Sequence, residues 1–341
     1  MIKVMEKERQ SVSGFTLVEV LVVLAIFGVV LGSVLKVFSI SYHSYTVQEE
    51  MAAMQQNVRV AKMFLERDVR MAGCGMKNFY DEGERVYALD FDNDSAVGDT
   101  GSDKLTINYI DYSVDSCDDL LPDLTCDGSM PTNSAVCNTV EDMSSPPYDV
   151  WTSSFVCNGT TYGKVPPFVD FPVLITSPDG SQSEIIYITQ TPGGKKLQNR
   201  PIGGTGKVIN TYPAGSTISF FNTSKLTEVA YYISNSVLMR ESPPGTSNPV
   251  AENIEDLQFA FGLDTDANGT VDSWINNADL TDVQKDQVRS VRINVLGCTA
   301  NEDTNHSSTR PTIEDHAGAG TSDGFHRKLL QVTVKVRNLG I

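Results

Sequence analysis

Basic residues are scarce in this sequence, and acidic residues outnumber them. The 341 residues include 26 Lys and Arg against 43 Asp and Glu, which gives a formal net charge of -17 at pH 7. Nucleic acids are held mainly by cationic side chains that neutralise phosphates, so we expect no nucleic-acid partner. Charged residues make up 20% and hydrophobic residues 40% of the chain, a balance typical of folded rather than disordered proteins.

The sequence also lacks the short motifs that mark many catalytic and zinc sites. It contains no Cys-x-x-Cys and no His-Glu-x-x-His, and it has only four histidines. The spacing of its six cysteines is too irregular for a zinc cluster. We therefore expect a protein that is not an enzyme, requires no cofactor and takes no small-molecule substrate.

Proline is absent from the segment between Phe15 and Gly73, which begins with a long apolar run. From Phe15 to Leu35 the only charged residue is Glu19, and about 20 apolar residues in a helix cross a bilayer core. No Ala-x-Ala cleavage pattern follows the run. The first fourteen residues carry three basic and two acidic side chains, so we expect this short leader to stay in the cytoplasm and the large domain to be exported.

The residues at the start of this run form a recognisable motif. Gly14-Phe15-Thr16-Leu17-Val18-Glu19 resembles the class III leader junction of type IV pilins and related pseudopilins. The resemblance implies that prepilin peptidase cuts between Gly14 and Phe15 and methylates the new amino terminus. Glu19 then becomes the fifth residue of the mature chain.

Glu19 also calls for a physical explanation, because a carboxylate inside a spanning helix is costly. Insertion scales give about 2.5–3.5 kcal/mol for a charge near mid-membrane. The α-amino group of a neighbouring subunit's Phe15 is a suitable cationic partner, and such a pair would set the axial register of a helical bundle. The alternative is that Glu19 lies at headgroup level and is simply solvated.

Apolar residues continue at helical spacing beyond the membrane run. Leu35, Phe38, Tyr42 and Tyr45 recur at three- and four-residue steps, and a second series runs Met51, Met54, Val58, Ala61 and Leu65. We expect one helix over residues 15–72, ended by two glycines, whose second half packs on a globular domain. A homodimeric coiled coil is the alternative use of the stripe.

Two further stretches resemble PilW-type minor pilins. They are the helix end LERDVRMAGCGM (65–76) and a C-terminal region with Tyr-Tyr-Ile-x-Asn-x-x-Leu-x-Arg and a closing Val-x-Val-Arg-Asn. The resemblance implies a minor pilin that primes or caps type IV pilus assembly with other minor and major pilins. It also implies residence in the inner membrane with a periplasmic domain, followed by incorporation into the extracellular pilus. We interpret Arg67, Asp68 and Arg70 as solvated charges without a chemical role.

Two other functions remain open at this point. One is a J-type minor pseudopilin of type II secretion, and the other is a pilus-tip adhesin or binding module. The predicted class is α+β and pilin-like, with a long transmembrane-to-periplasmic helix packed on an antiparallel sheet domain that carries a loop-rich insert. The predicted segments are a leader (1–14), a transmembrane helix (15–39), the periplasmic half of the helix (40–75), a cysteine-bearing β insert (76–225) and a C-terminal antiparallel sheet (226–341).

Export makes disulfides the expected state of the cysteines. Six cysteines allow 15 connectivities. We predict Cys117–Cys126 and Cys137–Cys157, each closing a short loop, which leaves Cys74 and Cys298 to pair. Reduced, buried thiols are the alternative.

One segment has the pattern of a calcium loop. Residues 264–272 read D-x-D-x-N-G-x-x-D, the first nine positions of an EF-hand-like loop. The predicted ligands are the side chains of Asp264, Asp266, Asn268 and Asp272 and the carbonyl of Thr270. The twelfth position, usually an acid, is Ile275, so Asp279 or water would have to replace it. We expect millimolar affinity if Ca2+ binds; the alternative is an Asn-Gly turn between strands.

Overall fold

The computed structural model describes most of the chain after the leader. The described residues are 14–81, 83–95, 101–113, 121–131, 136–143, 151, 155–157, 159–162, 171–191, 194–199, 208–318 and 320–338. Residues 1–13 of the predicted leader and Cys117 lie outside them. The chain divides into two compact units, Met1–Ala53 and Met54–Ile341, which are described separately below.

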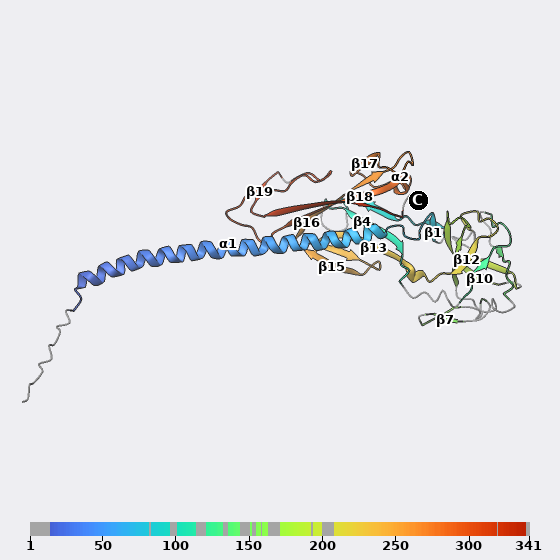
Figure 1. The fold of residues 1–341 in the computed structure, drawn as a ribbon, viewed down its shortest axis with the longest axis horizontal. Helices are drawn as coiled ribbons and strands as arrows, with labels where there is room; N and C mark the ends of the chain where they lie inside the picture. The colour runs from blue at the N-terminus through green and yellow to red at the C-terminus, as the bar shows by residue number, and fades with distance from the viewer. Residues whose placement is uncertain are drawn as a thin grey trace, which may run out of the picture. The chain divides into compact units, whose positions relative to one another are not determined.

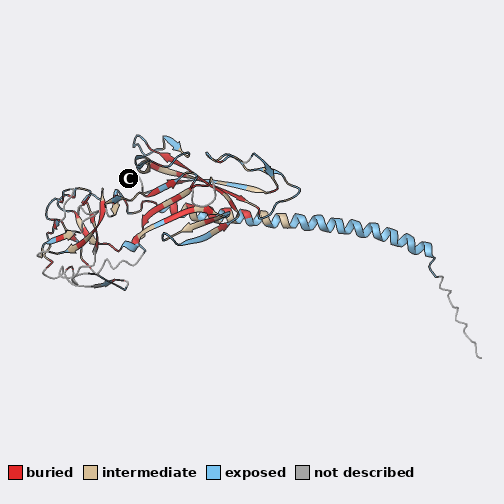
Figure 2. Ribbon diagram, turned by 180° about the vertical axis from the view of Figure 1, so that it is seen from behind, coloured by how far each residue is buried: buried red, intermediate tan, exposed pale blue. Residues whose placement is uncertain are grey.

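A single helix, α1 (Leu17–Met71), confirms the helix predicted from the apolar spacing. It begins two residues after the predicted start and gives way to turns at residues 72–75, where Gly73 and Gly75 adopt φ of 71° and 73°. A positive φ is costly for residues with a Cβ, so these glycines can end the helix cleanly. Residues 14–45 are exposed along their whole length, drawn pale blue in Figure 2.

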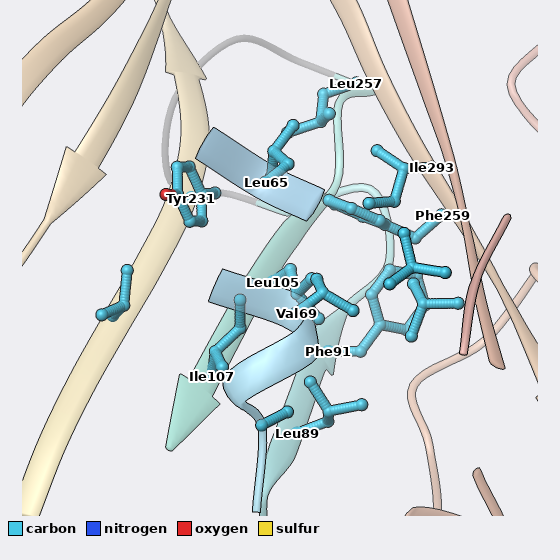
Figure 3. Packing of buried hydrophobic residues seen from close by; sticks show 14 of the residues in the cluster. Leu65, Val69, Leu89, Phe91, Leu105, Ile107, Tyr231, Leu257, Phe259 and Ile293 are labelled. Carbon is cyan, nitrogen blue, oxygen red and sulfur yellow. The ribbon is translucent and has the colours of Figure 1, made fainter. Parts of the chain in front are cut away.

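Within the second unit, the predicted stripe of α1 is buried against two antiparallel sheets. Met54, Val58, Ala61 and Leu65 of the predicted stripe are buried, whereas Met51 is half-buried. Val58, Ala61 and Leu65, together with Val69 one turn further on, join one hydrophobic core with side chains from both sheets, as Figure 3 shows around Leu65 and Val69. Because the stripe is already covered by this chain's own sheets, it is not available for the alternative coiled coil.

The first of these sheets has five strands in the order β15-β14-β13-β4-β3. The second has four strands in the order β17-β16-β18-β21, and Figure 1 labels most of both. The bounds of the first are β3 (Leu89–Asp92), β4 (Lys104–Ile110), β13 (Leu226–Ser234), β14 (Val237–Glu241) and β15 (Ser247–Glu252). Those of the second are β16 (Ile254–Leu263), β17 (Ser273–Ile275), β18 (Val288–Cys298) and β21 (Arg327–Lys335).

α1 and β18 approach each other closely at Gly297. A Cβ built on Gly297 would lie 2.3 Å from Cγ2 of Val58 and 3.3 Å from Cγ of Met54. Only the absence of a side chain lets β18 pass the helix at this distance.

A third sheet has eight strands among the described residues, and all of them lie within the predicted insert, residues 76–225. Its main path is β2-β1-β10-β9-β12-β5, with β11 joining β10 to β6. Its pairs are antiparallel except β1 with β10, which are parallel. The bounds are β1 (Phe79–Asp81), β2 (Glu84–Arg85), β5 (Leu124–Thr125), β6 (Val136–Asn138), β9 (Phe171–Thr176), β10 (Ser183–Gln190), β11 (Lys196–Asn199) and β12 (Thr217–Phe220).

Short elements complete the described structure. They are the hairpins β7 (Phe155–Cys157) with β8 (Thr160–Tyr162) and β19 (Ser308–Thr309) with β20 (Ser322–Asp323), helix α2 (Asp282–Gln287), and a 3-10 turn, η3 (Thr223–Lys225). The insert has a hydrophobic core of its own, which includes Leu124, Val173, Ile186, Tyr212 and Ile218.

The predicted insert, residues 76–225, contains strands of two different sheets. Strands β3 and β4 belong to the five-stranded sheet, and their apolar side chains lie in the core shared with α1. β4 ends at Ile110 and β13 starts at Leu226, and these two residues are direct partners in the antiparallel ladder. We call the segment between these partners, residues 111–225, the excursion; its two ends meet, and β1 and β2 contribute to its sheet from before β3.

Candidate functional site

The first turn of α1 is closed by reciprocal hydrogen bonds between Thr16 and Glu19. The backbone N–H and the hydroxyl of Thr16 both donate to Oε2 of Glu19, at 2.8 and 2.9 Å, and the N–H of Glu19 donates to the Thr16 Oγ1 at 3.3 Å. This is a capping box, and it also places a carboxylate at the positive end of the helix dipole. The pattern Thr16-x-x-Glu19 in the sequence predicts such a cap, but above we considered Glu19 only as a charge in the membrane-spanning helix.

The exposed part of α1 offers an apolar surface on all sides. Among the described residues, α1 is the one helix long and apolar enough to cross a membrane, and none of its most apolar window is buried. Phe15 is 87% exposed and Phe27 59%. In water such a surface would drive association, so it requires lipid or other apolar helices around it.

Asp68, near the other end of α1, lies at the centre of a buried polar cluster. Its residue surface is only 2% exposed. Oδ2 accepts hydrogen bonds from the Tyr231 hydroxyl at 2.7 Å and from Nε of Arg240 at 2.9 Å, and Oδ1 accepts one from Nε of Arg67 at 2.8 Å. Tyr231 and Arg240 come from the hairpin β13–β14, so the cluster fixes the helix to that hairpin.

The cluster corrects the interpretation of Asp68 as a solvated charge. Burial opposes ionisation of Asp68, but hydrogen bonds from Arg67, Tyr231 and Arg240 outweigh it and lower the pKa of the carboxyl. Burial and the negative charge of Asp68 raise the pKa of the Tyr231 hydroxyl. Sequence spacing could not reveal the contact, because Asp68 and Arg240 are 172 positions apart. Arg67 and Arg70 are largely exposed, as expected.

Three carboxylates of the predicted calcium loop converge. One oxygen each from Asp264, Asp266 and Asp272 lies within 4.8 Å of the others. Asp264 is buried directly after β16, whereas Asp266 and Asp272 are exposed. The loop turns tightly at Gly269, where φ is 85°. A divalent cation takes this kind of oxygen donor.

The rest of the loop is less favourable for calcium. Oδ2 of Asp264 accepts from Nε of Arg289 at 3.0 Å, so a guanidinium already compensates the buried charge. Ile275, at the twelfth position, ends β17 and packs on the shared core. Asp279 accepts the backbone N–H of Asn93 at 2.8 Å and is not part of the three-carboxylate group.

Two family models match the sequence. One is described as the prokaryotic N-terminal methylation motif and matches residues 9–35. The other, PilW, is described as type IV pilus-assembly protein W and matches residues 226–338. The chain is type IV pilin-like.

Other comparisons add little to this class. No curated protein matches the pilin-like chain. Among solved structures, a type IV-like pilin from Thermus thermophilus matches with 14% sequence identity, covering 51% of this chain and 87% of that one, at a TM-score of 0.24. Pilin-like families are structural rather than enzymatic.

The two matches cover the start of the long helix and the C-terminal strands described above. The methylation motif contains Gly14, Phe15 and Glu19, and the apolar helix that follows is consistent with membrane anchoring of the pilin-like chain. The PilW match runs from the start of β13 to just past β21, and so includes Tyr231 and Arg240 of the buried cluster. Residues 111–225 lie outside both matches.

The cysteines of the pilin-like chain do not pair as predicted. Cys126 and Cys137 are free thiols whose sulfurs lie 2.7 Å apart, and Cys157 is disulfide-bonded. The predictions Cys117–Cys126 and Cys137–Cys157 are therefore wrong. The reason is an antiparallel pairing in which Cys126 lies opposite Thr139. Cys137 precedes Thr139 by two residues, and its sulfur therefore comes close to that of Cys126.

Cys74 and Cys298 do not pair either, and both are free. Cys298 follows Gly297, which touches α1 at Val58. The helix runs on from Val58 to Met71 before Cys74 is reached, about 20 Å at 1.5 Å per residue. A disulfide requires Cα atoms within about 7 Å.

Proposed function

We propose that this protein is a minor pilin that acts in type IV pilus assembly as a subunit of the priming or tip complex. The observation that carries the proposal is the fully exposed apolar half of α1, which begins at a methylation-type junction. The PilW match supports an assembly role rather than that of a bulk shaft subunit. In this proposal the neighbours are other minor pilins and the major pilin, and prepilin peptidase processes the chain between Gly14 and Phe15.

The proposed mechanism depends on the apolar half of α1 and on the carboxylate of Glu19. In the inner membrane the apolar half of α1 is solvated by lipid, and in the filament by neighbouring helices, so transfer between the two costs little hydrophobic free energy. Glu19 then supplies register: its carboxylate pairs with the cationic amino terminus of the adjacent subunit's Phe15. The capping hydrogen bonds from Thr16 hold that carboxylate at the helix end before the subunit enters the filament.

The experiment that tests this proposal is intact mass and N-terminal sequencing of the protein from native membranes and from sheared pili. We expect a chain that starts at methylated Phe15 in both fractions. An uncut chain, or one cut elsewhere, would reduce it to an ordinary anchored protein. Correct processing together with absence from pili and impaired protein secretion would favour the J-type pseudopilin of type II secretion.

A second candidate function belongs to residues 111–225. This excursion has a hydrophobic core of its own, separate from the core around α1. A binding module at a pilus tip requires such a core. If it acts as an adhesin, its removal abolishes attachment while piliation stays normal. If it serves assembly, its removal abolishes pili.

A further inference from the structure

Cys126 and Cys137 lie side by side on neighbouring segments of the insert. The backbone N–H of Asp127 donates to the carbonyl of Asn138 at 2.9 Å, which holds the two segments together in antiparallel pairing. Their sulfur atoms lie 2.7 Å apart, and the residues are 1% and 3% exposed. Both side chains belong to the insert's hydrophobic core, which also contains the disulfide-bonded Cys157.

We propose that Cys126 and Cys137 form a second disulfide of the insert, one that the spacing of cysteines in the sequence did not predict. A bonded pair of sulfurs is about 2.05 Å apart, so the two atoms need to approach by less than 1 Å. The backbone is already in place on both sides of the bond. The cross-link would join β6 to the segment that follows β5, and so fix the β11–β6 extension of the eight-stranded sheet.

The reaction is thiol–disulfide exchange with a disulfide of an oxidoreductase or with oxidised glutathione. The thiolate of one of the two cysteines attacks the oxidant and forms a mixed disulfide, which releases one oxidant thiolate. The thiolate of the other cysteine then attacks the sulfur of the first, forms the internal bond and releases the second oxidant thiolate. Two protons leave the cysteines and two electrons pass to the oxidant, which is reduced to a dithiol or to two glutathione molecules.

Either cysteine can supply the thiolate of the first step, because the two sulfurs lie side by side and either one can donate the hydrogen bond between them. Both sulfurs are covered in the folded insert, so an oxidoreductase cannot reach them there. The bond therefore forms before the insert closes, or during its transient opening.

In vivo this chemistry rests on the export that the proposed function includes, but the test does not. Full-length protein in detergent is unfolded, refolded in a glutathione buffer containing oxidised and reduced forms, then denatured and alkylated. Peptide mapping identifies which cysteines are linked. We expect Cys126 joined to Cys137, the Cys157 disulfide intact, and only Cys74 and Cys298 alkylated.

Single-serine variants sharpen the result. Cys126→Ser should leave Cys137 alkylated, and Cys137→Ser should leave Cys126 alkylated, with the Cys157 disulfide retained as a reference for folding and oxidation. Cys298→Ser is the matched control, and it should leave the Cys126–Cys137 linkage unchanged. Alkylation of both Cys126 and Cys137 in wild-type protein whose Cys157 disulfide is intact would overturn the proposal, as would a linkage of either residue to any other cysteine.

Discussion

At the scale of single residues, Glu19 meets two requirements with one carboxylate. Its Oε2 closes the first turn of α1 through Thr16, and its charge is the feature that we propose neighbouring subunits recognise. These roles can be separated, because a glutamine in a capping box also accepts from the cap residue while carrying no charge.

Glu19→Gln should therefore preserve the helix start and remove the intersubunit pair. We expect normal cleavage after Gly14 and a normal amount in the membrane, but at least a tenfold loss from sheared pili. Quantitative immunoblotting of both fractions measures this. Thr16→Val, which loses the cap hydroxyl but keeps the Glu19 charge, is the control. Wild-type incorporation of Glu19→Gln would show that the charge is dispensable.

Asp68 is the residue whose role depends most on the fold. Asp68→Asn removes the charge that compensates Arg240, whose side chain is 22% exposed. Breaking a buried pair typically costs 3–5 kcal/mol, and the partial exposure of Arg240 reduces this, so we expect a loss of about 2–3 kcal/mol. Thermal unfolding of the full chain in detergent measures it. Arg67→Ala, at a 59% exposed side chain, should cost less than about 1 kcal/mol.

The difference in stability between wild type and Asp68→Asn should change with pH in one direction. The pKa of Asp68 is lowered in the folded state, so its contribution is fully present above the unfolded value of about 3.9. It is lost as the pH falls through the folded value. The stability difference between wild type and Asp68→Asn should therefore be constant near pH 7 and shrink below about pH 4. A difference that grows on acidification would contradict this assignment.

At the scale of elements, the packing of α1 on β18 depends on one missing side chain. Gly297→Ala places a Cβ 2.3 Å from Cγ2 of Val58, and overpacking of this kind costs about 1–3 kcal/mol. Val58→Ala removes that methyl group, so the double variant should recover part of the loss. The coupling in a double-mutant cycle of melting curves measures the contact. Gly128→Ala, with nothing within 4 Å, is the control.

The loop between β16 and β17 gives a second prediction at this scale. If its three carboxylates bind Ca2+ with a Kd near 1 mM, 10 mM Ca2+ stabilises the chain by about 1.4 kcal/mol. Asp266→Asn and Asp272→Asn should abolish the rise in Tm, while Asp279→Asn should leave it intact because Asp279 binds Asn93 instead. An unchanged Tm in wild type would make the loop a turn held by Arg289.

Periodicity in the sequence was enough to predict the helix. The stripe through Val58 and Leu65 is visible as an apolar pattern, and so are the runs of longer strands such as β9, β10, β16 and β18. The sequence did not show which strands pair with each other or which residues lie opposite the cysteines. An alternating strand such as β4 looks the same whether it pairs with β13 or with the insert, and a cysteine's spacing does not reveal the strand opposite it. Asp68 was misread for the same reason, since polarity alone suggests exposure.

At the scale of the whole molecule, residues 111–225 are an extension of one hairpin. Ile110 and Leu226 are ladder partners, so an Asn-Gly turn can replace everything between them without changing the register of β4 and β13. Phe79→Ser in the same chain removes an apolar side chain that packs beside Ile185 and would otherwise be left uncovered.

We expect this shortened chain to fold, to be cleaved after Gly14 and to enter pili, while attachment to surfaces is lost if the excursion is a binding module. Electron microscopy of pili and an adhesion assay read the two outcomes separately. A full-length chain carrying only Phe79→Ser is the control. Loss of pili from a shortened chain that is still correctly processed would assign the excursion to assembly.

The adjacency of Ile110 and Leu226 also determines how the molecule responds to tension. A pull on α1 passes through the shared core into β4 and β13, whose hydrogen-bonded ladder connects them directly. The excursion starts and ends on the two sides of that ladder, at strands only about 4.8 Å apart. Load that runs between β4 and β13 therefore bypasses the excursion while the ladder holds, and the excursion is coupled to α1 through β1, which pairs with β10.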